Sequence, residues 1–434
     1  MHPPRSLRDI LFWSAVAGVL LAGISIRVHH LYTVESRTPD EQQYTYFGAT
    51  LASRGLGATA DLVREFNGTE ARWKLPPPTR VGYTGLLAAV MTATGIRDPW
   101  AGACLSSVCS VLSLCVLLVA GIRFAGRWAT LPALLLYMHS PLSLVLARRA
   151  WQDEVVTLLG AATLYLCGEA VSAGRRTPWY ALAAFAGALT VLVKESGALL
   201  FGLGFLWLFW DAWQRGCIRK DGAWVAAFGL GFAILSVLMA VFLSGGLTPW
   251  LDVYRNVRRS FASNAYVLNQ QTGAWWEYLW TLYVMVPVSA TLFCVGTLSA
   301  CWQTARPDQK QAQAAPALRG LALVVLVFLG ACASAPYLKN LRFASAVFVP
   351  FYLLAGLGAS RLFGAVRHVS SPRLALAVRA CVAGVVLLGV LADYASFHRL
   401  RDWTDGRDLA LGKIRAVYSV SPRSVLRRVS WALE

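Results

Sequence analysis

The chain has 434 residues and a formal net charge of +18; 57% of its residues are hydrophobic and only 14% are charged. Its mean hydropathy is +0.53, whereas soluble domains carry about 25% charged residues, so the composition excludes an ordinary soluble enzyme. Because the basic residues stand in short clusters between apolar runs, the charge does not indicate nucleic-acid binding either.

Eleven apolar segments approach the ~20 residues that a helix needs to cross a bilayer. They are residues 10–28, 100–122, 128–147, 155–173, 178–193, 197–213, 223–243, 277–302, 320–337, 341–360 and 374–393. A further apolar stretch, 81–96, is short and contains glycine and threonine, which favours an interfacial or re-entrant helix. We therefore expect an all-α, polytopic membrane domain over 1–393 with about eleven transmembrane helices, followed by a short tail, 394–434.

The distribution of lysine and arginine predicts the orientation of these spans. With a cytoplasmic N-terminus and a non-crossing 81–96, the inner segments contain Arg5, Arg8, Arg123, Arg127, Arg175, Arg176, Arg215, Arg219, Lys220, Arg306, Lys310, Arg319, Arg361, Arg367 and Arg373. The short outer loops contain Arg148, Arg149, Lys194, Lys339 and Arg342. The positive-inside rule favours this arrangement. It leaves two long loops, 29–99 and 244–276, and the tail on the extracytoplasmic side.

Charged residues gather at the outer ends of several predicted spans. Asp40 and Glu41 follow the first span, ARRAWQDEVV covers 147–156, LVKESG covers 192–197, and YLKNLRF covers 337–343. Any one of them is explained by a tight turn whose charges reach the headgroup region. Because charge beside a span is costly, their common location on one side predicts a shared polar cavity at the membrane surface.

The second long outer loop contains a basic helix. Arg255, Arg258 and Arg259 have the i, i+3, i+4 spacing of one helix face within 251–262. Flanking tryptophans favour an interfacial helix with aromatic anchors. A second interpretation, compatible with the first, is that the arginines bind phosphates of a lipid substrate.

Five stretches, in chain order, resemble the polyprenyl-phosphate-sugar-dependent membrane glycosyltransferases, which include the protein O-mannosyltransferases and the aminoarabinose transferases. PDEQQYTYFGATLASRG resembles the first-loop motif through Asp40, Glu41, Tyr44, Ala49 and Gly55. LPPPTRVGYTGLLA resembles a Lys-Pro-Pro entry to a juxtamembrane helix, although Lys74 stands two residues before Pro76. The remaining matches are the acidic loop with Asp153, the turn with Lys194, where Glu195 and Ser196 replace the usual residues, and Arg342-Phe343 with Pro350.

This resemblance implies a C-type glycosyltransferase (GT-C) fold and transfer of a sugar from a polyprenyl-phosphate donor to a lipid, glycan or protein acceptor at the outer face. Asp40 is the expected general base, with Glu41 supporting it. Lys194 and Arg342 are expected to stabilise the departing phosphate. The expected substrate-binding residues are Tyr44, Lys74, Arg80, Asp153, Glu154, Lys194, Arg255, Arg258, Arg259 and Arg342.

The sequence leaves the metal question open and predicts no obligate cofactor. Asp153 is a candidate for binding sugar hydroxyls, for holding Mg²⁺ or Mn²⁺ together with Asp40, or for pairing with Arg148 or Arg149. Carboxylates without fixed spacing are a weak metal motif. The cysteines lack CxxC spacing, and nearly all lie inside apolar runs as small buried hydrophobes.

The alternative functions are a transporter or lipid flippase and a membrane scaffold. Many spans with charged residues suit a transporter, but such proteins often contain two related halves, and this chain has its long first loop and acidic sites in one half only. A scaffold does not explain the polar outer cavity. The Ala/Arg-rich composition with little lysine is typical of a GC-rich bacterium, which places the expected enzyme in the inner membrane with its active site facing the periplasm or exterior.

Overall fold

The computed structural model describes residues 7–31, 34, 37–173, 176–264, 267–302, 314–336, 340–366 and 371–400. Within these residues the fold is built from helices. They are α1 (Leu7–Leu31), α2 (Pro39–Arg54), α3 (Thr59–Gly68), α4 (Val81–Thr94), α5 (Pro99–Ala120), α6 (Arg127–Met138), α7 (Pro141–Ala147), α8 (Asp153–Ser172), α9 (Thr177–Val193), α10 (Ser196–Gln214), α11 (Ala223–Leu243), α12 (Leu247–Phe261), α13 (Trp275–Met285), α14 (Pro287–Trp302), α16 (Ala315–Ser334), α17 (Phe348–Ala365) and α18 (Pro372–Leu400). The part of the expected tail beyond residue 400 lies outside the described residues.

Each predicted span coincides with one helix or one bent pair of helices. Among the described residues, eight helices are long and apolar enough to cross a membrane, and α6–α7 and α13–α14 would each add one if a bent pair is a single span. The remaining predicted span is α9, whose 17 residues extend about 26 Å against a hydrocarbon core of about 30 Å. An all-helical membrane fold is therefore confirmed for the described residues, whereas the count of eleven depends on whether α9 and both bent pairs cross.

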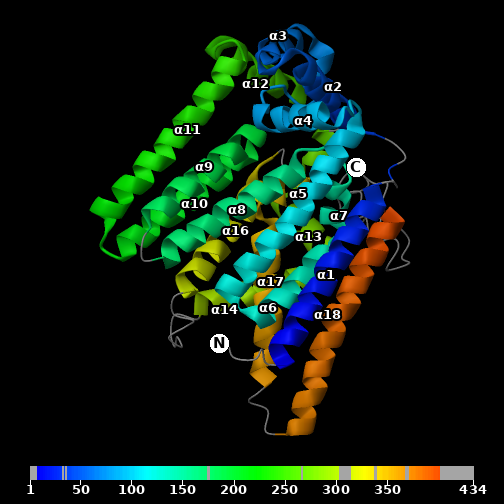
Figure 1. Cartoon of the computed structure of the whole chain (residues 1–434), viewed down its shortest axis with the longest axis vertical. Coiled ribbons are helices and arrows are strands. Elements are labelled where there is room, and N and C mark those ends of the chain that lie inside the picture. Colours follow the sequence, from blue (N-terminus) through cyan, green and yellow to red (C-terminus); the bar gives the residue numbers. More distant parts are fainter. Residues whose placement is uncertain are drawn as a thin grey trace.

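Four shorter helices form a cap over one end of the spans. Figure 1 shows α2, α3 and α12 together at the top, with α4 lying across the ends of the long helices beneath them. α4 packs against α2 and against α9, and its 14 residues measure only about 21 Å. This short transverse helix is the stretch 81–96 that the sequence predicts to be interfacial or re-entrant.

Local sequence signals fix the start and the end of α2. Thr38 and Glu41 form a capping box at the start of α2, Pro39 occupies the first turn, and Gly55 ends the helix with a φ of 76°. Such reciprocal capping satisfies backbone N–H groups that the first turn leaves without partners. The start of α2, and with it Asp40, is thereby held in one orientation at this end of the spans.

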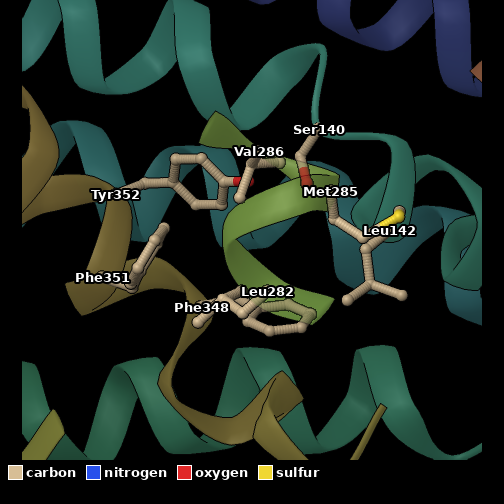
Figure 2. A pocket seen from close by; sticks show the side chains of 8 residues that line it. All are labelled: Ser140, Leu142, Leu282, Met285, Val286, Phe348, Phe351 and Tyr352. Atoms are coloured by element: carbon tan, nitrogen blue, oxygen red, sulfur yellow. The ribbon is translucent and has the colours of Figure 1, made fainter. Parts of the chain in front are cut away.

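Two pairs of consecutive helices are sharply bent, and residues beside both bends line one small space. The axis bends by 60° between α6 and α7 and by 110° between α13 and α14, where Pro141 and Pro287 begin the second helices. Figure 2 shows the side chains that surround the small space between these bends and α17: Ser140, Leu142, Leu282, Met285, Val286, Phe348, Phe351 and Tyr352. Its volume of about 10 Å³ accommodates at most one water, so the junction is a packed core.

Glycines allow a close contact between α14 and α17. A Cβ atom on Gly296 would lie 1.8 Å from the carbonyl oxygen of Leu354, and one on Gly358 would lie 2.0 Å from that of Leu292. Small residues at such contacts let helix backbones approach each other inside a membrane. The same α17 is joined to the segment that carries Arg342, so this packing helps to fix one wall of the site described next.

Candidate active site

A cavity with a volume of about 460 Å³ lies between the cap and the ends of the spans. Its charged lining residues come from separate parts of the chain: Asp40, Lys74, Arg80, Lys194, Glu195 and Arg342. Apolar residues of α10, α12 and α16 complete the wall, among them Leu199, Tyr254 and Phe328. Four cationic side chains against two carboxylates make the cavity electropositive, which suits an anionic ligand. The apolar wall suits a lipid.

Asp40 and Arg342 form an ion pair at this cavity. The Nη2 atom of Arg342 donates to Oδ2 of Asp40 at 2.9 Å, and the two side chains remain 13% and 26% exposed, respectively. The guanidinium also lies over the ring of Trp151 at 5.1 Å. Asn340 caps the short helix Leu341–Val347 by accepting from the Arg342 backbone N–H. Both side chains are thus accessible from the cavity, while helix caps hold the backbones of Asp40 and Arg342 in place.

Lys194 reaches the same cavity from the turn between α9 and α10. Its ammonium group donates to Asp153 and lies 4.9 Å from the centre of the Phe343 ring. Burial lowers the pKa of Lys194, although the carboxylate of Asp153 acts in the opposite direction. Asp153 itself is fully buried and does not line the cavity. Asp153 thus pairs with Lys194, whereas Arg149 pairs with Glu41.

Arg80 ties the cap to the α9–α10 turn. Its guanidinium contacts both carboxylate oxygens of Glu195, with a shortest distance of 2.8 Å, and it also donates to the hydroxyl of Tyr44. Lys74, at the end of the short helix Glu70–Lys74, lines the cavity nearby. Tyr44 is fully buried, so it acts on the cavity through Arg80.

Glu41, the second carboxylate of the expected acidic pair, does not line the cavity. Its side chain is fully buried and pairs with Arg149 at 3.2 Å and with Arg37 at 3.0 Å. It also accepts from the backbone N–H groups of Ala150 and Thr38. The two adjacent carboxylates point apart because successive residues of a helix differ by about 100°. Glu41 therefore joins α2 to the turn before α8, and Asp40 alone of the two faces the cavity.

Replacing Glu41 with glutamine is expected to destabilise the protein by about 3–5 kcal/mol, because the buried guanidinium of Arg149 loses its counter-charge. The measurement is the thermal unfolding midpoint of the purified protein in detergent. Glu65, paired with Arg72 at the surface, provides a control, since Glu65→Gln should cost at most about 1 kcal/mol. Equal shifts for the two variants would contradict the anchoring role of Glu41.

Glu154 also lies away from the cavity, inside the helix bundle. It is fully buried and interacts electrostatically with Arg27 of α1. Arg27 in turn donates to Ser110 at 2.7 Å and to Ser143 at 3.2 Å. This network connects α1, α5, α7 and α8, which indicates a structural role for Glu154.

The three arginines of α12 do not face the cavity. Arg255, Arg258 and Arg259 are exposed, and Arg255 pairs with Asp252 at 2.9 Å. The helix predicted for 251–262 exists, but its cavity face carries Tyr254, Val257 and Phe261. The phosphate-binding interpretation of these arginines therefore gains no support from their location.

Other lining residues were not anticipated from the sequence. Gln152, Asn264 and Gln271 bring amide groups into the cavity, and Trp73 brings an indole ring. Gln152 directly precedes Asp153, so its position beside the acidic turn could have identified it as a cavity residue. Nothing in the local pattern of the other three distinguishes them from ordinary loop residues.

No cluster of three or more His, Cys, Asp or Glu side chains with the arrangement of a metal site occurs within the described part of the chain. Asp40 and Asp153 have cationic partners, Arg342 and Lys194. A divalent cation bound between these carboxylates would have to displace both side chains.

Comparison with known proteins agrees with the fold. A family model for dolichyl-phosphate-mannose-protein mannosyltransferases matches residues 83–241, which is less than half of the chain. No curated protein matches the sequence.

Solved structures resemble the chain over nearly its whole length. The archaeal oligosaccharyltransferase AglB from Archaeoglobus fulgidus, in complex with an inhibitory peptide and a dolichol-phosphate, has a TM-score of 0.60 at 11% identity, covering 99% of this chain and 60% of its own. ArnT from Cupriavidus metallidurans bound to undecaprenyl phosphate has a TM-score of 0.51 at 15% identity, covering 93% and 74%. The arabinosyltransferase EmbB from Mycobacterium smegmatis has a TM-score of 0.51 at 14% identity, covering 99% and 42%.

The chain therefore has the GT-C fold that these membrane glycosyltransferases share, and the family model agrees with this over residues 83–241. The chain spans about 60% of the length of AglB and 42% of the length of EmbB.

Proposed function

We propose that the protein transfers a sugar from a polyprenyl-phosphate donor to a hydroxyl or phosphate group of a lipid, glycan or protein acceptor. The observation that carries the proposal is the meeting of Asp40, Lys194 and Arg342 in one cavity, although they lie far apart in the sequence. A carboxylate and two cations beside an apolar wall are the groups that such a reaction requires. AglB and ArnT, which share the fold, were determined with dolichol-phosphate and undecaprenyl phosphate, which supports a lipid-phosphate donor.

In this proposal Asp40 accepts the proton of the acceptor as its oxygen attacks the anomeric carbon of the donor sugar. The bond between that carbon and the phosphate oxygen breaks, and polyprenyl phosphate leaves with the bonding electrons. Lys194 and Arg342 compensate the negative charge that develops on the phosphate. A single displacement of this kind inverts the configuration at the anomeric carbon. No step requires a metal ion, and Mg²⁺ or Mn²⁺ dependence is a separate question for assay.

A transferase and a flippase give opposite results once the membrane is removed. We expect purified protein in detergent to release polyprenyl phosphate from a labelled polyprenyl-phosphate-sugar when acceptor lipids or glycans from the bacterial envelope are supplied. Detergent solution has no second compartment, so a flippase leaves the donor chemically unchanged. Thin-layer separation of the labelled lipid measures the conversion. An intact donor in every acceptor mixture, combined with donor translocation in vesicles, would replace the transferase proposal with the flippase.

The proposed site faces the periplasm if the positive-inside rule holds for this chain. Reporter fusions placed after Gly126 and after Gly246 are expected to report the cytoplasm and the periplasm, respectively. Gly246 precedes α12 in the cap, whereas Gly126 precedes α6 at the other end of the spans. The reverse pair of signals would put the cavity on the cytoplasmic side and would require a donor presented there.

A further inference from the structure

A second polar cavity lies at the end of the spans opposite to the candidate active site. Its volume is about 300 Å³, and it is enclosed by the ends of α8, α10 and α16. Figure 1 shows the connection from α10 to α11 at the far end of the bundle from α3 and α12. The charged residues that line the cavity are Arg176, Asp211, Arg215 and Arg319. None of these residues takes part in the proposed transfer reaction.

The carboxylates beside this cavity balance only part of its positive charge. Arg215 pairs with Asp211 at 2.8 Å and with Asp221 at 2.7 Å, and Arg176 lies 3.7 Å from Asp221. Arg319 has no carboxylate within ion-pair distance in the described part of the chain, and its Nε atom is enclosed without a described hydrogen-bond partner. Three guanidinium groups against two carboxylates leave one positive charge that an external anion can satisfy.

The cavity opens onto surface that a bilayer would cover. Trp210 and Leu323 line it and are 50% and 46% exposed. Leu206 on α10 and Leu326 on α16 extend the exposed apolar surface toward the middle of the spans. The indole of Trp207 forms the rear wall against Gly320, where any Cβ atom would lie 1.9 Å from the ring. A ligand here meets cations at the depth of the headgroups and apolar side chains one turn deeper.

We propose that this cavity, defined by Arg176, Arg215, Arg319 and Trp210, binds the headgroup phosphate of an anionic phospholipid from the leaflet opposite to the candidate active site. The phosphate accepts from Arg319 and Arg176, and one acyl chain follows the groove between α10 and α16. Basic pockets between transmembrane helices are suited to such lipids. The distribution of lysine and arginine assigns this end of the bundle to the cytoplasmic leaflet. The inference is independent of the sugar-transfer proposal.

The test is lipid retention by the purified full chain, measured by native mass spectrometry after incubation with phosphatidylglycerol or phosphatidylcholine of identical acyl chains. We expect preferential retention of phosphatidylglycerol and an approximately fivefold loss in Arg319→Gln, because a basic residue near the surface contributes about 1 kcal/mol to binding an anionic lipid. Arg219→Gln is the matched control, since Arg219 is exposed on the same side and does not line the cavity; it should retain the lipid. Gln214→Trp fills the cavity without changing charge and should also reduce retention.

Three outcomes would overturn the proposal. Equal retention of the two lipids would remove the headgroup phosphate selectivity on which it rests. Equal losses of lipid retention in Arg319→Gln and Arg219→Gln would mean that the general positive charge of this surface attracts the lipid, without a specific binding site. Displacement of phosphatidylglycerol by millimolar inorganic phosphate would assign the cavity to a water-soluble anion. Size-exclusion profiles of all variants establish that the comparison is made between folded proteins.

Discussion

Replacing Asp40 with asparagine is expected to reduce sugar transfer by about 10²–10⁴-fold, the range typical for loss of a general base. The amide has the same shape as the carboxylate but cannot accept the acceptor proton. Asp40 lies in the first turn of α2, is 26% exposed at its side chain, and contacts Arg342. The substitution should therefore leave the fold intact. The measurement is polyprenyl phosphate release from a labelled donor at saturating acceptor.

Asp252→Asn is the control for this experiment. Asp252 is also a carboxylate paired with an arginine on a helix of the cap, but it does not line the cavity. Its substitution should leave the transfer rate unchanged. Activity of Asp40→Asn above about a tenth of the wild-type value would assign the base elsewhere, and Glu195 is then the remaining carboxylate in the cavity wall.

Removing the charge of Arg342 is expected to lower the transfer rate by about 10²–10³-fold, the magnitude found when one preorganised donor to a developing anion is lost. Arg342→Gln keeps a hydrogen-bond donor near Asp40 but removes the positive charge beside the leaving phosphate. The effect should appear in the rate and in the KM for the donor, with the KM for the acceptor little changed. Arg258→Gln, an exposed cation on the outer face of α12, is the matched control. Loss of acceptor binding alone would contradict the assignment.

Lys194 requires a double substitution, because its removal also leaves Asp153 buried without a counter-charge. Lys194→Met alone should cost about 3–5 kcal/mol of stability, which would obscure any catalytic effect. Lys194→Met combined with Asp153→Asn removes both charges and should recover most of that stability while transfer stays impaired. Recovery of transfer together with stability would reduce Lys194 to a structural cation.

The pH profile gives an independent test of Lys194. Burial lowers its pKa, so the ammonium loses its proton at a lower pH than an exposed lysine does. Transfer should therefore decline on the alkaline side as pH rises through this lowered pKa, since the neutral amine no longer compensates the leaving phosphate. Lys194→Arg keeps the charge to higher pH and should move the alkaline decline upward. An unchanged alkaline limb in that variant would mean that another group titrates.

Much of the architecture could be predicted because the bilayer imposes strict rules on sequence. A segment that crosses a bilayer must be apolar and near 20 residues long, and its backbone N–H and C=O groups must form hydrogen bonds within a helix. The predicted spans therefore coincide with α1, α5 to α11, α13, α14 and α16 to α18. The short, interrupted stretch 81–96 identified the transverse helix α4 for the same reason. The kinks were less predictable, because a proline permits a bend while neighbouring helices set its angle.

The amino-acid sequence by itself determined the membrane class and the helical fold, and it indicated that Asp40, Lys194 and Arg342 would share one cavity. Charged residues beside a membrane span are costly, so several charged turns at the same end of the spans indicate a functional cavity. Only the tertiary structure separated Asp40 from Glu41, assigned Lys194 to Asp153, and turned the arginines of α12 away from the cavity. Adjacent residues on a helix point in different directions, and ion-pair partners are chosen by packing between distant segments. The local sequence therefore predicts neither the direction of a side chain nor its ion-pair partner.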